Sequence, residues 1–478
     1  MTVPTTRPGQ RPGPPPPAPA PPWKLLLAAL SLLLCLLLWL NGLLESLNRP
    51  SVVDALELRQ RQLQALAAPA LPERLRPWLA GEEALADLAD QLEQGLADGP
   101  GPGSPDQLLQ LTLLSRSQGH PRTAAVLAEL GRQVPPERRP LLELLDSGSS
   151  GMATAPAQLA RLSAPWEGEL SPLTSQLLCQ ALEPERPDCG DAAVQRRALA
   201  RLLAVSWLPG ILLLLGVVLL AREGWLLWRR RGTPLPPLVG PQLDLVDVTL
   251  LIAGGFVVLG ELSVPLVLEP ALRPLLAPLQ STPVRQQGMQ VLLLYLGLML
   301  PPLLILRAQL QPMAARRPPA GWLQWRWRPP ASALRGALGH MLMVLPVVAL
   351  TGWLVDRLVG DPGGSNPLLE LVLTARDPVA LSCFALTAMV LAPLFEETLF
   401  RGVLLPVLGS HWGGAAGVVA SALVFGLAHL SLGELVPLVM LGLGLGWLRL
   451  RSGRLGPCVL MHGLWNGFTF ANLLLLGV

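Results

Sequence analysis

Long apolar runs separated by short polar stretches dominate the chain from residue 202 onward. Several of these runs reach about twenty residues, the length that an α-helix needs to cross the hydrocarbon core of a bilayer. An earlier apolar run, Leu25 to Leu44, has no small-residue cleavage site after it, so it is interpreted as a retained anchor. We therefore expect about nine membrane spans, near residues 25–44, 203–221, 248–268, 288–306, 337–355, 378–400, 412–430, 434–448 and 457–476.

The stretch between the first two apolar runs has a different pattern. Charged residues return at positions 46–200, and leucines recur at helical spacing, as at Leu56, Leu63 and Leu66. Clusters of proline and glycine interrupt the stretch and are typical of helix ends. This pattern predicts a helical extramembrane domain of about 150 residues.

These patterns divide the chain into five parts. Residues 1–22 are rich in proline without apolar periodicity, which is typical of a disordered or polyproline tail. The fold class that we expect is all-α, a polytopic membrane helix bundle with a helical extramembrane domain between its first and second spans. The parts after the tail are an anchor helix at 23–45, the helical domain at 46–200, an additional transmembrane region at 201–330 and a C-terminal membrane domain at 331–478.

The composition agrees with a membrane protein. Hydrophobic residues make up 51% of the chain and charged residues 14%, whereas a soluble domain has about 25% charged residues. The formal net charge of +3 indicates no global basic surface. The partners expected from composition are therefore the lipid bilayer and no nucleic acid.

The distribution of arginines predicts an orientation. Arginines gather after alternate spans, at 222–231, 307–335 and 449–454, while the other loops carry mixed or acidic charge. By the positive-inside rule, this places the N-terminus in the cytoplasm and residues 46–200 outside it.

Cys179 and Cys189 are the only cysteines outside the apolar runs. The expected orientation places them on the non-cytoplasmic side, where disulfides form and persist. Pro184 and Pro187 can turn the chain between them. We predict a Cys179–Cys189 disulfide, with two free buried thiols as the alternative.

Candidate chemistry is concentrated in the last ninety residues. Glu396 and Glu397 lie side by side in an apolar run, and Arg401 follows one turn later. Ionisable residues at membrane depth are costly and usually face the interior of a bundle. The spacing of Glu397 and Arg401 favours an ion pair. Glu396 is about 100° further round the helix, so it can point elsewhere and act as a base.

Two later apolar runs add imidazoles and an amide. His429 follows Phe425 by one helical turn, and His462 precedes Asn466 by one turn. A single membrane histidine is more often a structural hydrogen-bonding group than a catalyst. The gathering of two carboxylates, an arginine, two imidazoles and an amide in under eighty residues instead favours a shared site in the membrane.

The three motifs Glu396-Glu397-x-x-x-Arg401, Phe425-x-x-x-His429 and His462-x-x-x-Asn466 resemble those of the CPBP family of intramembrane proteases. This family includes type II CAAX prenyl endopeptidases and bacteriocin-immunity relatives, and the resemblance covers roughly residues 335–478. It implies a helical bundle with a membrane cavity that cleaves a peptide bond in a protein or peptide substrate, lipidated in some cases. By this resemblance, Glu396 and His429 activate water, and His462 and Asn466 support the oxyanion. Glu397, Arg401 and Phe425 shape the site.

The family is often described as a metalloprotease, which leaves the cofactor open. Glu396, His429 and His462 could serve as three zinc ligands with an open position for water. The chain lacks the local H-E-x-x-H pattern of many zinc proteases. We expect catalysis by glutamate without a certain cofactor, with a divalent metal such as zinc as the alternative.

Two other functions compete with an endopeptidase. One is a non-catalytic scaffold or immunity-type factor that keeps the fold. The other is a transporter, in which Glu261 of the third span would join the buried ionisable residues along a pathway. Because every motif position is intact, the sequence favours the enzyme.

Overall fold

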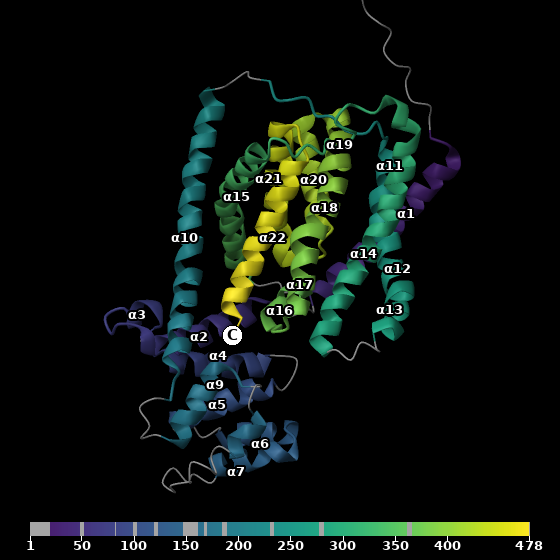
Figure 1. Cartoon of the computed structure of the whole chain (residues 1–478). Coiled ribbons are helices and arrows are strands. Elements are labelled where there is room, and N and C mark those ends of the chain that lie inside the picture. Colours follow the sequence, from purple (N-terminus) through teal and green to yellow (C-terminus); the bar gives the residue numbers. More distant parts are fainter. Residues whose placement is uncertain are drawn as a thin grey trace, which may run out of the picture.

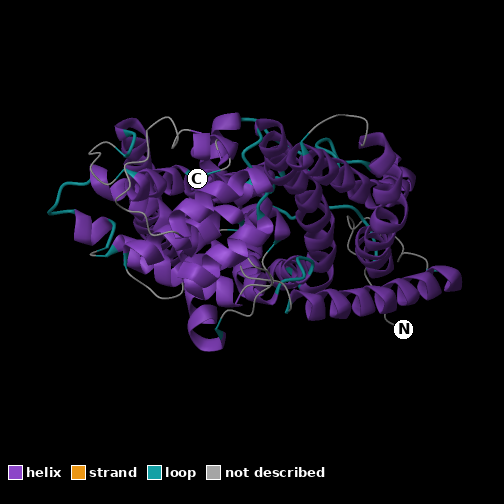
Figure 2. Cartoon of the chain, turned by 90° about the horizontal axis from the view of Figure 1, so that it is seen from below, coloured by secondary structure: helices purple, strands orange, loops and turns teal. Residues whose placement is uncertain are grey.

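The computed structural model describes residues 20–47, 52–81, 83–98, 103–118, 123–146, 161–166, 170–183, 189–229, 234–276, 282–360 and 366–477. Over these ranges the chain forms helices and loops without any strand (Figure 2). The Pro-rich tail expected at 1–22 lies almost wholly outside the described residues.

Eight helices in the described part of the chain are long and apolar enough to cross a membrane (Figure 1). The predicted polytopic bundle is confirmed, and the chain is an integral, multi-pass membrane protein. The eight are α1 (Pro22–Ser46), α10 (Ala192–Arg229), the continuous α11–α13 (Leu245–Leu276), α14 with its last turn (Pro283–Arg316), α15 (Pro330–Val359), the continuous α17–α19 (Pro378–Trp412), α21 (Leu432–Ser452) and α22 (Gly456–Leu476).

The segment expected to span at 412–430 is shorter than predicted. It forms α20, a helix of 14 residues from Gly414 to Leu427. At 1.5 Å per residue this helix is about 21 Å long, less than the hydrocarbon core of about 30 Å. A turn follows, in which Leu430 has a left-handed φ of 51°. The turn, Ala428 to Ser431, contains neither proline nor glycine, so composition alone could not locate the end of the helix.

Two arginines next to the predicted ends of spans lie inside the bundle. Arg401 directly follows the span expected at 378–400, and Arg449 was expected to belong to a cytoplasmic cluster. Both are fully buried, and the helix of Arg401 continues to Trp412. Arg449 donates to the carbonyls of Arg401 and Val239. Charge therefore failed as a boundary signal here because groups inside the bundle accept from both guanidinium groups, the Glu397 carboxylate and the Gly442 carbonyl from Arg401 and two carbonyls from Arg449.

The bundle consists of two groups of helices, one around α15 and α20–α22 and one made of α1 and α11–α14 (Figure 1). They meet where α14 packs on α17. Two of the long described helices include π-helical segments, and α14 ends in a 3₁₀ segment. The parts of these three helices are α11 (Leu245–Thr249), η4 (Leu250–Leu259), α12 (Gly260–Ser263), η5 (Val264–Leu268), α13 (Glu269–Leu276), α14 (Pro283–Leu310), η7 (Gln311–Arg316), α17 (Pro378–Leu386), η8 (Thr387–Leu391), α18 (Ala392–Glu397), η9 (Thr398–Leu404) and α19 (Leu405–Trp412).

Helix α1 joins the two groups. Lys24 near its start pairs with Asp247, with 2.5 Å between Nζ and Oδ1. Further along, the Trp39 indole donates to the Leu427 carbonyl at 2.8 Å. Gly42 lies so close to Leu430 that a Cβ added to Gly42 would be 2.9 Å from the Cδ1 atom of Leu430. The first helix of the chain thus holds the turn that follows α20.

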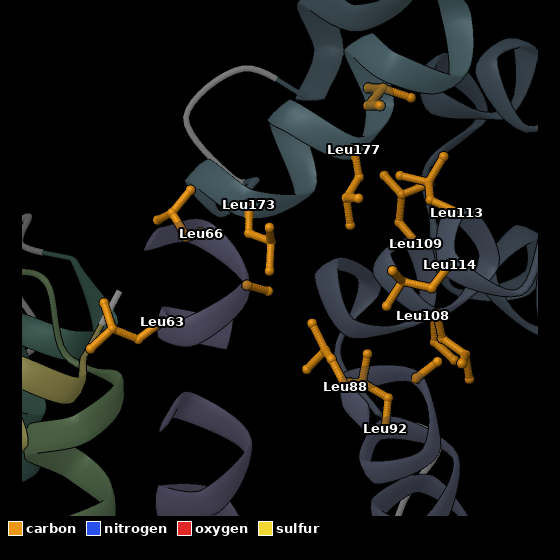
Figure 3. Packing of buried hydrophobic residues seen from close by; sticks show 14 of the residues in the cluster. Leu63, Leu66, Leu88, Leu92, Leu108, Leu109, Leu113, Leu114, Leu173 and Leu177 are labelled. Carbon is orange, nitrogen blue, oxygen red and sulfur yellow. The ribbon is translucent and has the colours of Figure 1, made fainter. Parts of the chain in front are cut away.

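The extramembrane domain is a set of short helices around a leucine core. In Figure 3, Leu63 of α2, Leu88 of α4, Leu109 of α5 and Leu173 of α9 lie around one core. The Ser104 side chain caps α5 together with Gln107. The helices are α2 (Val52–Ala67), α3 (Arg76–Leu79), α4 (Ala84–Asp98), α5 (Pro105–Ser117), α6 (Thr123–Gln133), α7 (Arg139–Asp146) and α9 (Pro172–Leu182).

This domain sits on the end of the bundle that carries the C-terminus (Figure 1). Its leucine core is continuous with Phe384 of α17, Leu473 of α22 and Leu373 of α16 (Pro367–Thr374). Arg201 of α10 donates to the carbonyls of Leu475 and Gly477. Because α10 runs through both parts without a break, the domain is anchored on the bundle.

Cys179 and Cys189 form a disulfide in the structure, with their Cα atoms 5.4 Å apart. We expect thiol labelling of denatured, unreduced protein to modify Cys35, Cys383 and Cys458 only. Reduction should add two labelled cysteines. A loop of this length contributes about 2–3 kcal/mol in the chain-entropy model. Labelling of Cys179 and Cys189 without reductant would contradict the bond and remove one support for the predicted outside location of the domain.

Candidate active site

The two adjacent glutamates lie near the middle of the 35-residue helix formed by α17–α19. Asp377 caps this helix through the amides of Val379 and Ala380. The π-helical segments η8 and η9 flank the pair on both sides. The Glu397 side chain is fully buried, whereas the Glu396 side chain is 14% exposed. Neighbouring residues on one helix therefore meet different surroundings, as their angular separation predicts.

Glu397 is held by a buried network. Its Oε1 accepts from Arg401 Nη1 at 2.8 Å and from His462 Nδ1 at 3.0 Å. The other end of the guanidinium donates to the Gly442 carbonyl at 3.1 Å. The predicted Glu397–Arg401 pair forms, and a hydrogen bond to a carboxylate assigns the proton of His462 to Nδ1. Nε2 of this ring is thus left to face the site.

His429 presents the same ring nitrogen to the same carboxyl group. Its Nδ1 lies 2.7 Å from the Phe425 carbonyl, which can only accept, so Nδ1 carries the proton. Nε2 lies 4.0 Å from Glu396 Oε2, and His462 Nε2 lies 3.9 Å from the same oxygen. These distances exceed a direct hydrogen bond but suit a single bridging water. The structure thus brings both imidazoles to Glu396.

Phe425 packs between the charged network and the two imidazoles. The Arg401 guanidinium lies 4.3 Å from the centre of its ring, within the range of a cation–π contact. The rings of His429 and His462 lie edge to face with it, at centroid distances of 4.7 and 5.8 Å. Phe425, which the sequence assigned to shaping the site, therefore touches three of its polar members.

Asn466 contacts the helix that carries Glu396 and Glu397. Its Nδ2 donates to the Ala388 carbonyl in η8 at 2.7 Å. A π-helical segment alters the usual backbone pairing, so a side-chain donor satisfies this carbonyl. The amide ties α22 to the glutamate helix, and its expected part in holding an oxyanion stays a prediction.

Tyr295 of α14 is a member of this cluster that the sequence analysis missed. Its hydroxyl donates to Glu396 Oε1 at 3.1 Å. It is the single tyrosine of the chain, and it lies inside an apolar span. That position was the available signal, because a tyrosine hydroxyl among apolar residues usually finds a partner.

The donors of the metal alternative lie close together without forming a metal site. Among the described residues, no three side chains of His, Cys, Asp or Glu are arranged to hold a metal ion. Glu396, His429 and His462 do converge, and the 3.9–4.0 Å between Nε2 and Oε2 is about 0.5 Å wider than the separation of two ligands at about 2.1 Å from a tetrahedral ion. Catalysis without a metal stays a prediction, and no step proposed below uses one.

Comparisons with known proteins agree with the C-terminal resemblance. Residues 378–468 match the family of type II CAAX prenyl endopeptidase Rce1-like proteins, and this range includes every predicted site residue. Tyr295 lies outside it. The family resemblance inferred from the sequence is therefore confirmed for the C-terminal part of the chain.

Two further matches carry no functional name. Residues 53–200 match a family described only as a domain of unknown function. An uncharacterized 24.3 kDa protein from Escherichia coli is 43% identical over 123 residues, which cover 25% of this chain and 56% of that relative. The chain thus spans about half the length of this curated relative. No solved structure matches.

Proposed function

We propose that the C-terminal part of the chain is an intramembrane endopeptidase that hydrolyses a peptide bond of a membrane-associated protein or peptide. The observation that carries this proposal is the convergence of Nε2 of His429 and Nε2 of His462 on Glu396 Oε2, at 4.0 and 3.9 Å. One water molecule could contact all three atoms. A general base must lie within hydrogen-bonding reach of the proton that it removes, directly or through one water.

The different partners of the two imidazoles suggest different roles. His462 donates from Nδ1 to the carboxylate of Glu397, so its ring is held with Nε2 toward the site, where protonation of Nε2 would make it a donor. His429 donates to a neutral carbonyl, so its Nε2 can accept. Glu396 and His429 would activate the attacking water: His429 Nε2 would accept a hydrogen bond from it, and Glu396 would take its other proton. His462, and Asn466 through its second amide hydrogen, would donate to the oxyanion that forms at the substrate carbonyl.

In this scheme, the water oxygen bonds to the carbonyl carbon while its proton passes to Glu396. Glu396 then delivers that proton to the leaving amine as the carbon–nitrogen bond breaks. Arg401 and Glu397 keep the charge of the site balanced throughout.

The substrate class rests on the family match, and a prenylated substrate is one candidate within it. The orientation, with the N-terminus in the cytoplasm and residues 46–200 outside it, rests on the positive-inside rule.

The transporter alternative relied on Glu261. In the structure, this residue occupies an exposed position on α12, where it does not line the interior of the bundle. The non-catalytic scaffold predicts the same fold but no turnover. An activity measurement therefore decides between the scaffold and the endopeptidase.

The test uses purified protein in proteoliposomes with a set of transmembrane and lipid-anchored peptides that carry a fluorophore and a quencher. We expect cleavage of at least one peptide, with new N-termini identified by mass spectrometry, and loss of cleavage in His429→Gln. His411→Gln is the matched control, because His411 Nδ1 lies against the Val407 carbonyl in the same local arrangement but at an exposed position.

A chelator separates the two catalytic schemes. We expect cleavage to persist in phenanthroline, because no step of the proposed scheme uses a metal. Loss of cleavage that added zinc restores would overturn the metal-free scheme. The absence of cleavage in the wild type across the whole peptide set would favour the scaffold.

A further inference from the structure

The hydrogen bond from Tyr295 to Glu396 joins the family-matched segment to a region that the match does not include. Tyr295 lies on α14, before residues 378–468 begin. We propose that Tyr295 is a positioning residue for Glu396, so that α14 completes the active site. This inference rests on the endopeptidase function proposed above and adds one residue and one helix to it.

The first observation in support is that the two carboxyl oxygens of Glu396 have different surroundings. Oε1 accepts from the Tyr295 hydroxyl at 3.1 Å. Oε2 is buried without a hydrogen-bond partner among the described residues, and it faces the two imidazole Nε2 atoms. The terminal torsion of a glutamate is broad and roughly two-fold. Holding Oε1 therefore fixes the direction in which Oε2 presents its lone pairs.

The second support is the aromatic wall that holds the tyrosine ring. Tyr295 lies edge to face with Phe395, the residue before Glu396, at a centroid distance of 6.3 Å. Phe256 of η4 also packs edge to face with Phe395, at a centroid distance of 5.5 Å. Edge-to-face pairs at these distances are favourable. The ring is therefore located by α14, η4 and α18 together, which sets where its hydroxyl can reach.

The third support is the fixed contact of α14 with the glutamate helix. Arg285 Nη2 pairs with Asp377 Oδ2 at 2.8 Å where the two helices begin. One turn on, a Cβ at Gly288 would meet the Ala380 Cα at 2.6 Å, so the backbones approach closely. Tyr295 is two turns after Gly288, on the same face of α14. The close contact thus sets the register that directs the tyrosine toward α18.

A positioning role predicts a specific kinetic change. A hydrogen bond to a charged group contributes about 1.5–3 kcal/mol, so losing it should lower kcat about 10- to 100-fold. KM should stay within about threefold, because the hydroxyl touches Glu396 and no substrate group. Tyr295→Phe keeps the ring and its packing while removing the hydroxyl. Met299→Leu, one turn later on the same helix in the same apolar cluster, is the matched control and should retain kcat within about twofold.

The single tyrosine also allows a measurement that needs no substrate. Protein labelled with ¹³C at tyrosine Cζ and held in nanodiscs will give one tyrosine resonance, from Tyr295. Replacing the carboxylate partner in Glu396→Gln should move this resonance. Glu261→Gln, which removes a carboxylate elsewhere in the membrane region, should leave it in place.

The outcomes separate this inference from the function on which it rests. A resonance that does not move in Glu396→Gln overturns the hydrogen bond and the positioning role. A moved resonance together with a Tyr295→Phe kcat within twofold of wild type, or with an equal loss in Met299→Leu, overturns the positioning role alone. A wild type without cleavage of any of the fluorogenic peptides overturns the endopeptidase itself, and the role in catalysis with it, while the resonance still reports the hydrogen bond. The inference stands if the resonance moves and kcat falls only in Tyr295→Phe.

Discussion

Replacing Glu396 with glutamine is expected to lower the rate of peptide-bond cleavage by about two to four orders of magnitude, because a general base typically contributes that much. The amide keeps the size of the side chain and can still accept from Tyr295 through its oxygen. It cannot take a proton from water at neutral pH. The fluorogenic proteoliposome assay measures the change, and membrane insertion should match that of the wild type.

Glu261→Gln is the control for this substitution. It also removes a carboxylate from a membrane helix, but at an exposed position, and should leave the cleavage rate unchanged. Cleavage by purified Glu396→Gln at the wild-type rate would remove Glu396 from the proposed mechanism. An equal loss in both variants would indicate a general effect of membrane charge instead.

Replacing Arg401 with methionine is expected to cause the largest loss of folded protein. Arg401 and Glu397 are both fully buried and lie 2.8 Å apart. Removing one partner of a buried pair costs about 3–5 kcal/mol, because the other charge stays desolvated and unpaired. The Gly442 carbonyl also loses its donor. The monodisperse fraction after solubilisation and the apparent melting temperature measure the effect.

Two companion variants test the cause. In Arg401→Met with Glu397→Gln, the unpaired charge is gone, so much of the folded fraction should return. Arg273→Met breaks another Glu–Arg pair of the same spacing, with Glu269, in which the arginine side chain is 74% exposed. An exposed pair contributes about 0–1 kcal/mol, so this variant should stay close to wild type. A double variant as unstable as Arg401→Met would contradict the charge explanation.

The parts of the site that the sequence could predict are those set by local spacing. Glu397 and Arg401 meet because residues four apart on a helix are neighbours, whatever the rest of the fold does. The difference between Glu396 and Glu397 follows from the same geometry. The convergence of His429 and His462 on Glu396 needed more than spacing, and the family resemblance supplied it.

Contacts across the bundle could not be predicted in this way. Tyr295 is 101 positions away from Glu396, and no local pattern connects them. The span ends beside Arg401 and Arg449 were misplaced because a charged residue beside an apolar run usually marks the membrane surface, whereas groups inside this bundle accept from both. The turn after α20 was missed because it contains neither proline nor glycine and so has no compositional signal.

The contact of Trp39 with the Leu427 carbonyl has a consequence for biosynthesis. The two residues are 388 positions apart, and at about 5–20 residues per second the ribosome needs roughly 20–80 s to make the chain between them. During that interval, α1 lies in the membrane without its contact to the Leu427 carbonyl. His462 is synthesised later still, so a nascent chain cannot assemble the proposed catalytic group. Newly made membrane proteins nearby would be spared cleavage until the whole molecule is inserted.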